Sequence, residues 1–148
     1  MKRVEGYSEK YDEGLRVATV EHGDQTRKGS GLPYVIHPVH VSVILLRHGF
    51  SQEAAIAGLL HDVVEDQGYR LSEIEARFGA RVAEMVAVLS ERKTDTDGVQ
   101  RPWELRKQEA LQQLRSASRE TVAVKCADTL DKARSFVRDL RQQWLDVW

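Results

Sequence analysis

The chain has 148 residues, and its 22 basic and 23 acidic side chains give a formal net charge of -1. This length suits one domain, so we expect residues 1–148 to form a single domain. The balanced charge argues against a nucleic-acid partner, because proteins that grip a phosphate backbone carry a basic excess. The single cysteine excludes an internal disulfide, and no apolar run approaches the roughly 18 residues of a membrane span. We therefore expect a cytoplasmic protein with no membrane partner, and homo-oligomerisation is left open.

Two helices and an intervening loop are predicted at the start of the chain. Charged and apolar residues mix over about residues 7–22 as in an amphipathic helix. Residues 23–33 lack helical periodicity and are rich in turn-forming residues, which indicates a loop. The second helix opens at His37 and extends to Gly49, because Pro38 suits a first helical turn.

The next helix is predicted to extend from the N-cap Ser51 to the terminating Gly68. Its last turns carry side chains of metal-ligand or acid–base type, namely His61, Asp62, Glu65 and Asp66. At about 3.6 residues per turn these four would share one helix face, within an arc of about 140°. Carboxylates near a helix C-terminus are disfavoured by about 0.3–1 kcal/mol each, and a bound cation would offset that penalty.

Further helices are predicted over about residues 71–78, 82–89, 103–116 and 119–144. We expect the helix at 103–116 to turn an apolar face inward, made of Trp103, Ala110, Leu111 and Leu114. The first half of the last helix is expected to be buried through Val122, Val124, Cys126, Ala127 and Leu130. No stretch alternates in the manner of a strand, so the predicted fold class is all-α.

Asp128 stands within the apolar first half of the last helix. A buried carboxylate is costly unless it is paired or metal-bound. Lys125 and Lys132 both lie at helical spacing from it, so an ion pair with either lysine is one interpretation. Metal binding is the other interpretation.

Three motifs taken together are more specific than any one of them. They are His37-Pro38, His61-Asp62-x-x-Glu65-Asp66 and Lys125-x-Ala127-Asp128. This combination resembles the HD-domain metal-dependent phosphohydrolases. More narrowly, the chain is similar to the hydrolase domain of the RelA/SpoT homologues and to the stand-alone small alarmone hydrolases, through Arg27-Lys28 followed by Pro33-Tyr34-x-x-His37-Pro38. The resemblance implies an all-α helical bundle around a single metal site.

The resemblance also implies the composition of that site. Its ligands would be His37, His61, Asp62 and Asp128. Two imidazoles and two carboxylates suit a borderline divalent ion. The family's usual ion is Mn2+, and the sequence leaves other divalent ions open. Glu65 and Asp66 would orient or deprotonate a water molecule and then manage the leaving group.

A nucleotide substrate follows from the same resemblance. In the resembled hydrolases the positions of Arg27 and Lys28 contact the base and phosphates, and those of Arg134 and Ser135 lie in the nucleotide site. Lys132 stands where those enzymes carry an asparagine that touches the nucleotide. The expected reaction is hydrolysis of the 3′-diphosphate of guanosine 3′,5′-bis(diphosphate), ppGpp, with release of pyrophosphate.

Other functions stay open at this stage. One is a phosphatase of another nucleotide, such as the 2′-phosphate of NADPH, and the ammonium of Lys132 could favour such a change of substrate. Another is a non-catalytic domain that senses a nucleotide. A purely structural helical domain is the third, and it requires the ligand-type residues to match the motif spacing by coincidence.

Overall fold

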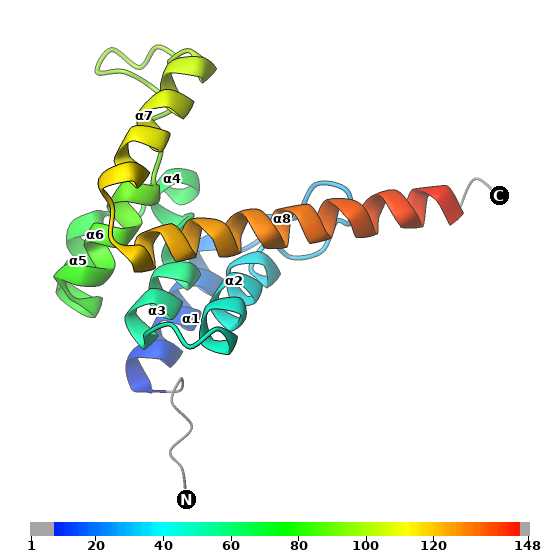
Figure 1. The fold of residues 1–148 in the computed structure, drawn as a ribbon, viewed down its shortest axis with the longest axis horizontal. Coiled ribbons are helices and arrows are strands. Elements are labelled where there is room, and N and C mark those ends of the chain that lie inside the picture. The colour runs from blue at the N-terminus through cyan, green and yellow to red at the C-terminus, as the bar shows by residue number, and fades with distance from the viewer. Residues whose placement is uncertain (1–7, 146–148) are drawn as a thin grey trace, which may run out of the picture.

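The computed structural model describes residues 8–145, and the regular elements in that range are all α-helices (Figure 1). Their bounds are α1 (Glu9–His22), α2 (Ile36–Arg47), α3 (Gln52–Leu60), α4 (Val63–Gln67), α5 (Leu71–Phe78), α6 (Ala80–Leu89), α7 (Trp103–Ser116) and α8 (Arg119–Leu145). The predicted all-α class is confirmed. Among these helices, none has both the length and the apolar character that a membrane crossing requires.

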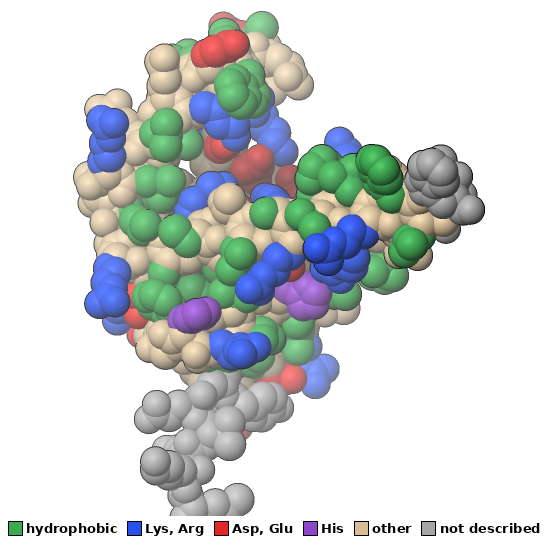
Figure 2. Space-filling view, turned by 45° about the vertical axis from the view of Figure 1, so that its right-hand side comes forward, with side chains coloured by type: hydrophobic (Ala, Val, Ile, Leu, Met, Phe, Trp, Pro, Cys, Tyr) green, Lys and Arg blue, Asp and Glu red, His purple; other side chains and the backbone are tan. Residues whose placement is uncertain are grey.

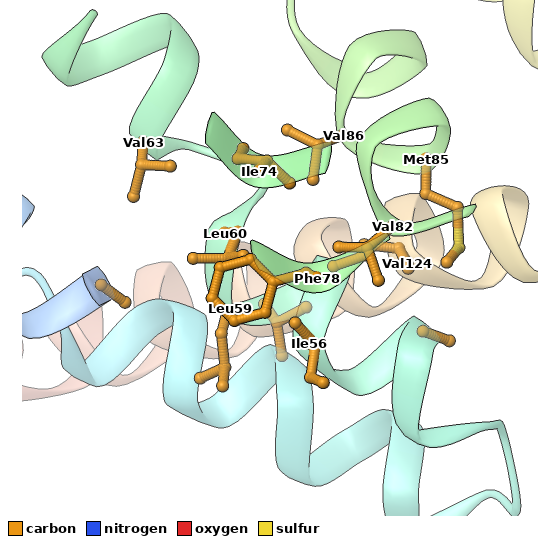
Figure 3. Close-up of a cluster of buried hydrophobic side chains, with 14 of the residues drawn as sticks. Ile56, Leu59, Leu60, Val63, Ile74, Phe78, Val82, Met85, Val86 and Val124 are labelled. Carbon is orange, nitrogen blue, oxygen red and sulfur yellow. The ribbon is translucent and has the colours of Figure 1, made fainter. Parts of the chain in front are cut away.

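Helix α3 forms the centre of the fold. Every residue from Ala54 to Leu60 is buried, and α3 contacts α1, α2, α6 and α8. The core that surrounds it includes Ile56, Leu59, Leu60, Ile74, Phe78, Val82, Met85, Val86 and Val124 (Figure 3). Each fully buried aliphatic side chain of this kind stabilises the fold by about 1.5–3 kcal/mol. The end of α3 is therefore held rigidly, and the residues that follow it inherit that rigidity.

The single helix predicted between Ser51 and Gly68 is instead two helices, α3 and α4, with a break between them. His61 and Asp62 form a turn between the two helices. The Nδ1 atom of His61 donates a hydrogen bond to the carbonyl oxygen of Gly58 at 2.7 Å, and the last carbonyls of a helix lack partners of their own. Gly68 ends α4 in the left-handed conformation at φ 70°, as predicted.

Helix α7 stands away from the body and contacts α6 (Figure 1). None of its residues is buried, so the prediction of an inward apolar face was wrong. Trp103 and Leu111 expose 60% and 61% of their surface. Periodicity identifies an apolar stripe on a helix, but burial also requires close packing, and the contact with α6 leaves Trp103 and Leu111 exposed.

Helix α8 extends across the body, and its C-terminal end projects beyond it (Figure 1). The side turned toward the body carries the buried residues Thr121, Val124, Ala127, Asp128, Asp131 and Ser135. Val122 and Leu130 are 38% and 37% exposed, and Cys126 is exposed, so their predicted burial was wrong. These three border an open apolar groove that Ile44 and Phe50 also line. Apolar side chains also show at the surface along α8 (Figure 2). The inner side is instead partly polar, and it brings carboxylates to the core.

Candidate metal centre

Four side chains from three parts of the chain converge at one point. His37 lies in the first turn of α2, His61 and Asp62 in the turn after α3, and Asp128 on the inner side of α8. The Nε2 atom of His37 lies 3.1 Å from Asp128 Oδ1 and 3.5 Å from Asp62 Oδ2. The Nε2 atom of His61 lies 3.1 Å from Asp62 Oδ2 and 3.5 Å from Asp128 Oδ1. All four residues are buried, and the two imidazole nitrogens share the same two oxygens.

His37, His61 and Asp128 place one ligand atom each within 4.8 Å of one another, and Asp62 Oδ2 approaches both imidazole nitrogens. Ligand atoms about 2.1 Å from a metal lie about 3.0 Å apart at neighbouring octahedral positions and about 3.4 Å apart in a tetrahedron. The observed separations of 3.1 and 3.5 Å are close to these values. The Nε2 atom of His61 is buried without a hydrogen-bond partner among the described residues. The donor set therefore fits a divalent metal ion.

Hydrogen bonds determine which nitrogen of each histidine is free to bind a cation. The carbonyl oxygen of Gly58 accepts from His61 Nδ1 at 2.7 Å, and the carboxylate of Asp131 accepts from His37 Nδ1 at 2.7 Å. Neither acceptor has a proton to give, so each Nδ1 carries the proton and each Nε2 of a neutral ring has a lone pair. Such bonds on the far nitrogen orient metal-binding histidines.

Asp131 joins three cationic or histidine side chains, and the sequence motifs did not single it out. Its Oδ2 atom accepts from Arg27 at 2.8 Å as well as from His37, and its Oδ1 atom lies 2.9 Å from His40 Nδ1. Burial would raise the pKa of this carboxyl, but the bonds from His37 and Arg27 outweigh burial and lower the pKa well below its ordinary 3.8. The one available signal was its i+3 spacing from Asp128, which places both on one side of α8.

The cluster favours positive charge at its centre. Burial would raise the pKa of the Asp128 carboxyl, but hydrogen bonds from His37 and His61 lower it far below the usual range. Asp62 behaves in the same way, since the charge of the His61 imidazolium overcomes burial and lowers its pKa. Burial lowers the pKa of His61, yet the neighbouring Asp62 carboxylate outweighs burial and raises it to about 10. Both carboxylates are therefore ionised and require a proton or a metal cation between them.

A cavity of about 220 Å³ opens beside His61, Asp62 and Asp128. Five carboxylates and four cationic side chains line it, and those beyond the convergent cluster are Glu65, Asp66, Glu91, Arg106, Lys107, Lys125 and Lys132. The expected acid–base residues Glu65 and Asp66 thus lie beside the cluster. Lys93, which the sequence motifs did not include, contacts both of them, at 3.1 Å from Glu65 Oε1 and 3.2 Å from Asp66 Oδ1.

Both lysines considered as partners of Asp128 contact it. Lys125 Nζ lies 2.9 Å from Asp128 Oδ2, and Lys132 Nζ lies 2.7 Å from Asp128 Oδ1. The Lys132 side chain is also 51% exposed, so its ammonium group faces both the cluster and the solvent. The ion-pair interpretation of Asp128 and the metal-ligand geometry therefore coexist in one structure.

Tyr34 also borders the cavity, and its hydroxyl donates a 2.6 Å hydrogen bond to Asp62 Oδ2. Burial and then the Asp62 charge raise the pKa of the Tyr34 hydroxyl above its ordinary 10.0, so this group remains a donor at neutral pH. Its ring packs against His37 with centroids 5.6 Å apart. Tyr34 therefore helps to orient two members of the cluster.

The other residues expected to bind substrate are not brought together. Lys132 lines the cavity, whereas Arg27 is held against Asp131 with 11% of its side chain exposed. Lys28 is exposed in the loop between α1 and α2, and Ser135 is buried on α8. Arg134 lines a separate groove between α2 and α8. Of this group, the described structure places Lys132 alone at the cavity wall.

The chain belongs to the HD domain family, whose model matches residues 15–148. Two comparisons narrow the likeness within that family. The chain is 33% identical over 135 residues to guanosine-3′,5′-bis(diphosphate) 3′-pyrophosphohydrolase MESH1 of Mus musculus, which covers 89% of this chain and 72% of that relative. It is 42% identical over 80 residues to the enzyme of the same description from Aquifex aeolicus (strain VF5). That match covers 54% of this chain but 11% of the Aquifex protein, so the chain spans a small part of this longer relative.

Solved structures agree with this assignment. A structure described as a metazoan ortholog of SpoT that hydrolyses ppGpp superposes with a TM-score of 0.75 at 31% identity, covering 86% of this chain and 70% of that one. A crystal structure of a Listeria monocytogenes EGD-e protein gives a TM-score of 0.62 at 41% identity, with 71% and 68% coverage. The fold and the family are therefore shown by sequence and by structure.

Proposed function

We propose that this protein is a divalent-metal-dependent phosphohydrolase that removes the 3′-diphosphate of ppGpp as pyrophosphate. The observation that carries the proposal is the convergence of two imidazole nitrogens and two carboxylate oxygens at 3.1–3.5 Å, beside a cavity of mixed charge. Its substrate is inferred from the similarity to MESH1, whose description names this reaction.

The proposed ligands are His37, His61, Asp62 and Asp128, and the proposed ion is Mn2+. A divalent ion bound there supplies Lewis acidity, which lowers the pKa of water and polarises a phosphoryl oxygen. Nitrogen and carboxylate donors together suit such a borderline ion. The protein contributes the fixed orientation of both imidazoles, through Gly58 for His61 and through Asp131 for His37.

Glu65 and Asp66 are the proposed acid–base pair. They follow Asp62 by one turn of chain and line the same cavity, so a water molecule beside the cluster is within their reach. Glu65 Oε2 accepts a hydrogen bond from the backbone N–H of Glu91 at 3.1 Å, which fixes the orientation of its carboxylate. An oriented carboxylate that takes a proton from the attacking water contributes typically about 10²–10⁴-fold to the rate.

The basic wall of the cavity fits a phosphorylated substrate. Arg106, Lys107, Lys125 and Lys132 line it together with the acid–base pair. Charged hydrogen bonds from such groups to phosphate are about twice as strong as neutral ones. Because Lys132 already lies 2.7 Å from Asp128 Oδ1, we propose that it contacts the phosphate nearest the metal centre.

The test is pyrophosphate release from ppGpp by Mn2+-loaded protein, measured beside NADPH as a competing substrate. Glu65→Gln is the test variant, and Glu84→Gln, an exposed residue of α6, is its matched control. We expect release by the parent and by Glu84→Gln, and a loss of at least about 100-fold in Glu65→Gln.

Each other result has a definite meaning. Phosphate release from NADPH with no turnover of ppGpp would replace the proposed substrate and keep the hydrolase class. Tight nucleotide binding without any turnover would indicate a sensor domain. Full activity of Glu65→Gln would remove that residue from the proposed acid–base pair.

A further inference from the structure

A second groove of about 460 Å³ lies between α2 and α8, on the face where basic and histidine side chains gather beside α8 (Figure 2). Arg47 from the end of α2 lines it together with Arg134 and Arg138 from α8. His40 and His48 of the α2 region add two imidazoles. The family resemblance predicted that Arg134 lies in the substrate site, but Arg134 lines this groove and not the metal cavity.

The arginines of the groove have no acidic partner within the described residues. Neither Arg47, Arg134 nor Arg138 forms an ion pair there, although other arginines of the chain do. The one carboxylate that lines the groove is Asp131, whose side chain is 4% exposed. It is already bonded to Arg27, His37 and His40, so little of its charge is available to the groove.

Three unpaired guanidinium groups around one hollow repel one another. An anion bound in the hollow would attract all three and offset that repulsion. Guanidinium groups match phosphate oxygens in a planar, two-point geometry. Val43 and Ile44 line the same groove and supply apolar surface. A volume of about 460 Å³ falls within the range of small-molecule sites and exceeds the need of a single phosphate.

We propose that the groove between α2 and α8 binds a phosphorylated organic molecule of the nucleoside diphosphate class. Its phosphates contact Arg47, Arg134 and Arg138, and its carbon-containing part covers Val43 and Ile44. The proposal does not depend on the proposed hydrolase reaction, because the groove and the metal cavity have no lining residue in common.

The groove and the metal cavity lie on different sides of α8. At about 100° per residue, Arg134 and Arg138 are turned by roughly 80–120° from Asp128, which faces the cluster. The two sites nevertheless meet at Asp131, which contacts His40 on the groove side and His37 on the metal side. A molecule in the groove would therefore be connected to His37 of the metal centre through His40 and Asp131.

The experiment is calorimetric titration of the whole protein with guanosine diphosphate and, separately, with inorganic pyrophosphate. Arg47→Gln and Arg138→Gln are the test variants. Arg141→Gln is the matched control, because Arg141 lies on the same helix but outside this groove. Lys132→Gln, in the metal cavity, reports binding at the other site. Melting temperatures of all variants verify that the fold is intact.

We expect guanosine diphosphate to bind about tenfold more weakly in each test variant and within about twofold of the parent in Arg141→Gln. Equal affinity in the parent and both test variants would overturn the proposal, and so would a loss confined to Lys132→Gln. Pyrophosphate that binds as tightly as guanosine diphosphate would overturn the role given to Val43 and Ile44. Absence of binding by either probe would overturn the site altogether.

Discussion

Asp131 connects three segments that are distant in the sequence. It contacts Arg27 from the loop before α2, and His37 and His40 from α2 itself, while it belongs to α8. The bond to His37 Nδ1 turns the opposite ring nitrogen toward Asp62 and Asp128. A carboxylate behind a histidine also raises the basicity of the ring, which strengthens metal binding.

Asp131→Asn is expected to weaken metal binding by about 10–100-fold, because the amide keeps the size of the side chain but removes its charge. The change also leaves Arg27 without its ion-pair partner. Competition for Mn2+ against a chelator measures the affinity directly. Asp139→Asn, on the same helix but away from the cluster, is the control. Unchanged affinity in a folded Asp131→Asn protein would show that this residue does not position His37.

At the residue scale, the sequence motifs predicted which side chains would meet at the cluster. His37, His61, Asp62 and Asp128 do converge, and their roles as ligands stay predictions. The contact between Arg27 and Asp131, 104 positions apart in the chain, was not predicted, because Asp131 belongs to none of the motifs. Spacing within one helix identifies neighbours on that helix, whereas contacts between helices depend on how they pack.

The packing of α3 on α2 depends on a glycine. A Cβ atom added at Gly58 would lie 3.0 Å from Leu45 Cδ1 and 3.2 Å from Val41 Cγ1, so α2 approaches the backbone of α3 closely here. Both neighbours are buried in the core and have little room to move. The carbonyl of the same residue orients His61, which links this packing to the metal centre.

Gly58→Ala is expected to destabilise the protein by about 1–3 kcal/mol through overpacking. Gly14→Ala is the matched control in α1, because its new methyl group would make an ordinary contact, 3.4 Å from Ile56 Cγ2. Alanine also favours helix over glycine by about 1 kcal/mol, so the control should be neutral or more stable. Urea denaturation measures both values. Equal stability of the two variants would contradict the close approach of α2 and α3.

Glu120 joins the start of α8 to the start of α3. Its Oε1 atom accepts from the backbone N–H of Ser51 at 3.3 Å, and its Oε2 atom accepts from Arg81 at 2.5 Å. Burial would raise the pKa of this carboxyl, but the bond from Ser51 and the pairing with Arg81 lower it below its ordinary 4.5. Ionised Glu120 therefore stabilises the folded state above pH 4.5, and that contribution is lost as the pH falls through the folded pKa.

Glu120→Gln should lower the free energy of unfolding by about 0.5–1 kcal/mol at pH 7, a value typical of a partly exposed ion pair. The difference from the parent should shrink below pH 4.5, where the parent carboxyl takes up its proton. Denaturation curves recorded at a series of pH values test this. A difference that stays constant down to acidic pH would exclude an effect of charge.

At the scale of single elements, sequence signals that act within one helical turn predicted the structure most accurately. Ser51 caps α3 as predicted, since its hydroxyl accepts from the N–H of Ala54 at 3.1 Å. The break at His61 and Asp62 was not predicted, because neither residue is a glycine or proline and apolar residues resume directly after them. A histidine that bonds back to the preceding turn has no signature in the sequence.

At the scale of the whole molecule, burial and charge hold different parts of the fold in place. Helices α3, α5 and α6 share the apolar core, whereas α7 and the loop before it are attached through ion pairs. Glu91 pairs with both Arg106 and Lys107 of α7, and Lys93 in the loop before α7 pairs with Glu65 and Asp66. Glu65, Asp66, Glu91, Arg106 and Lys107 all line the cavity beside the metal centre. That residues 1–148 form one domain stays a prediction.

This division predicts that α7 opens locally while the core stays closed. Screened ion pairs contribute little, and local openings concentrate where few apolar contacts are buried. Raising the salt from about 0.05 M to about 0.5 M should accelerate amide hydrogen exchange in α7 and leave α3 unchanged. Glu91→Gln should have the same effect at low salt, because it weakens the pairing with both Arg106 and Lys107. Mass spectrometry of the exchanged peptides resolves the two helices. Equal protection of α7 and α3 at every salt concentration would show that α7 is held by contacts other than these charges.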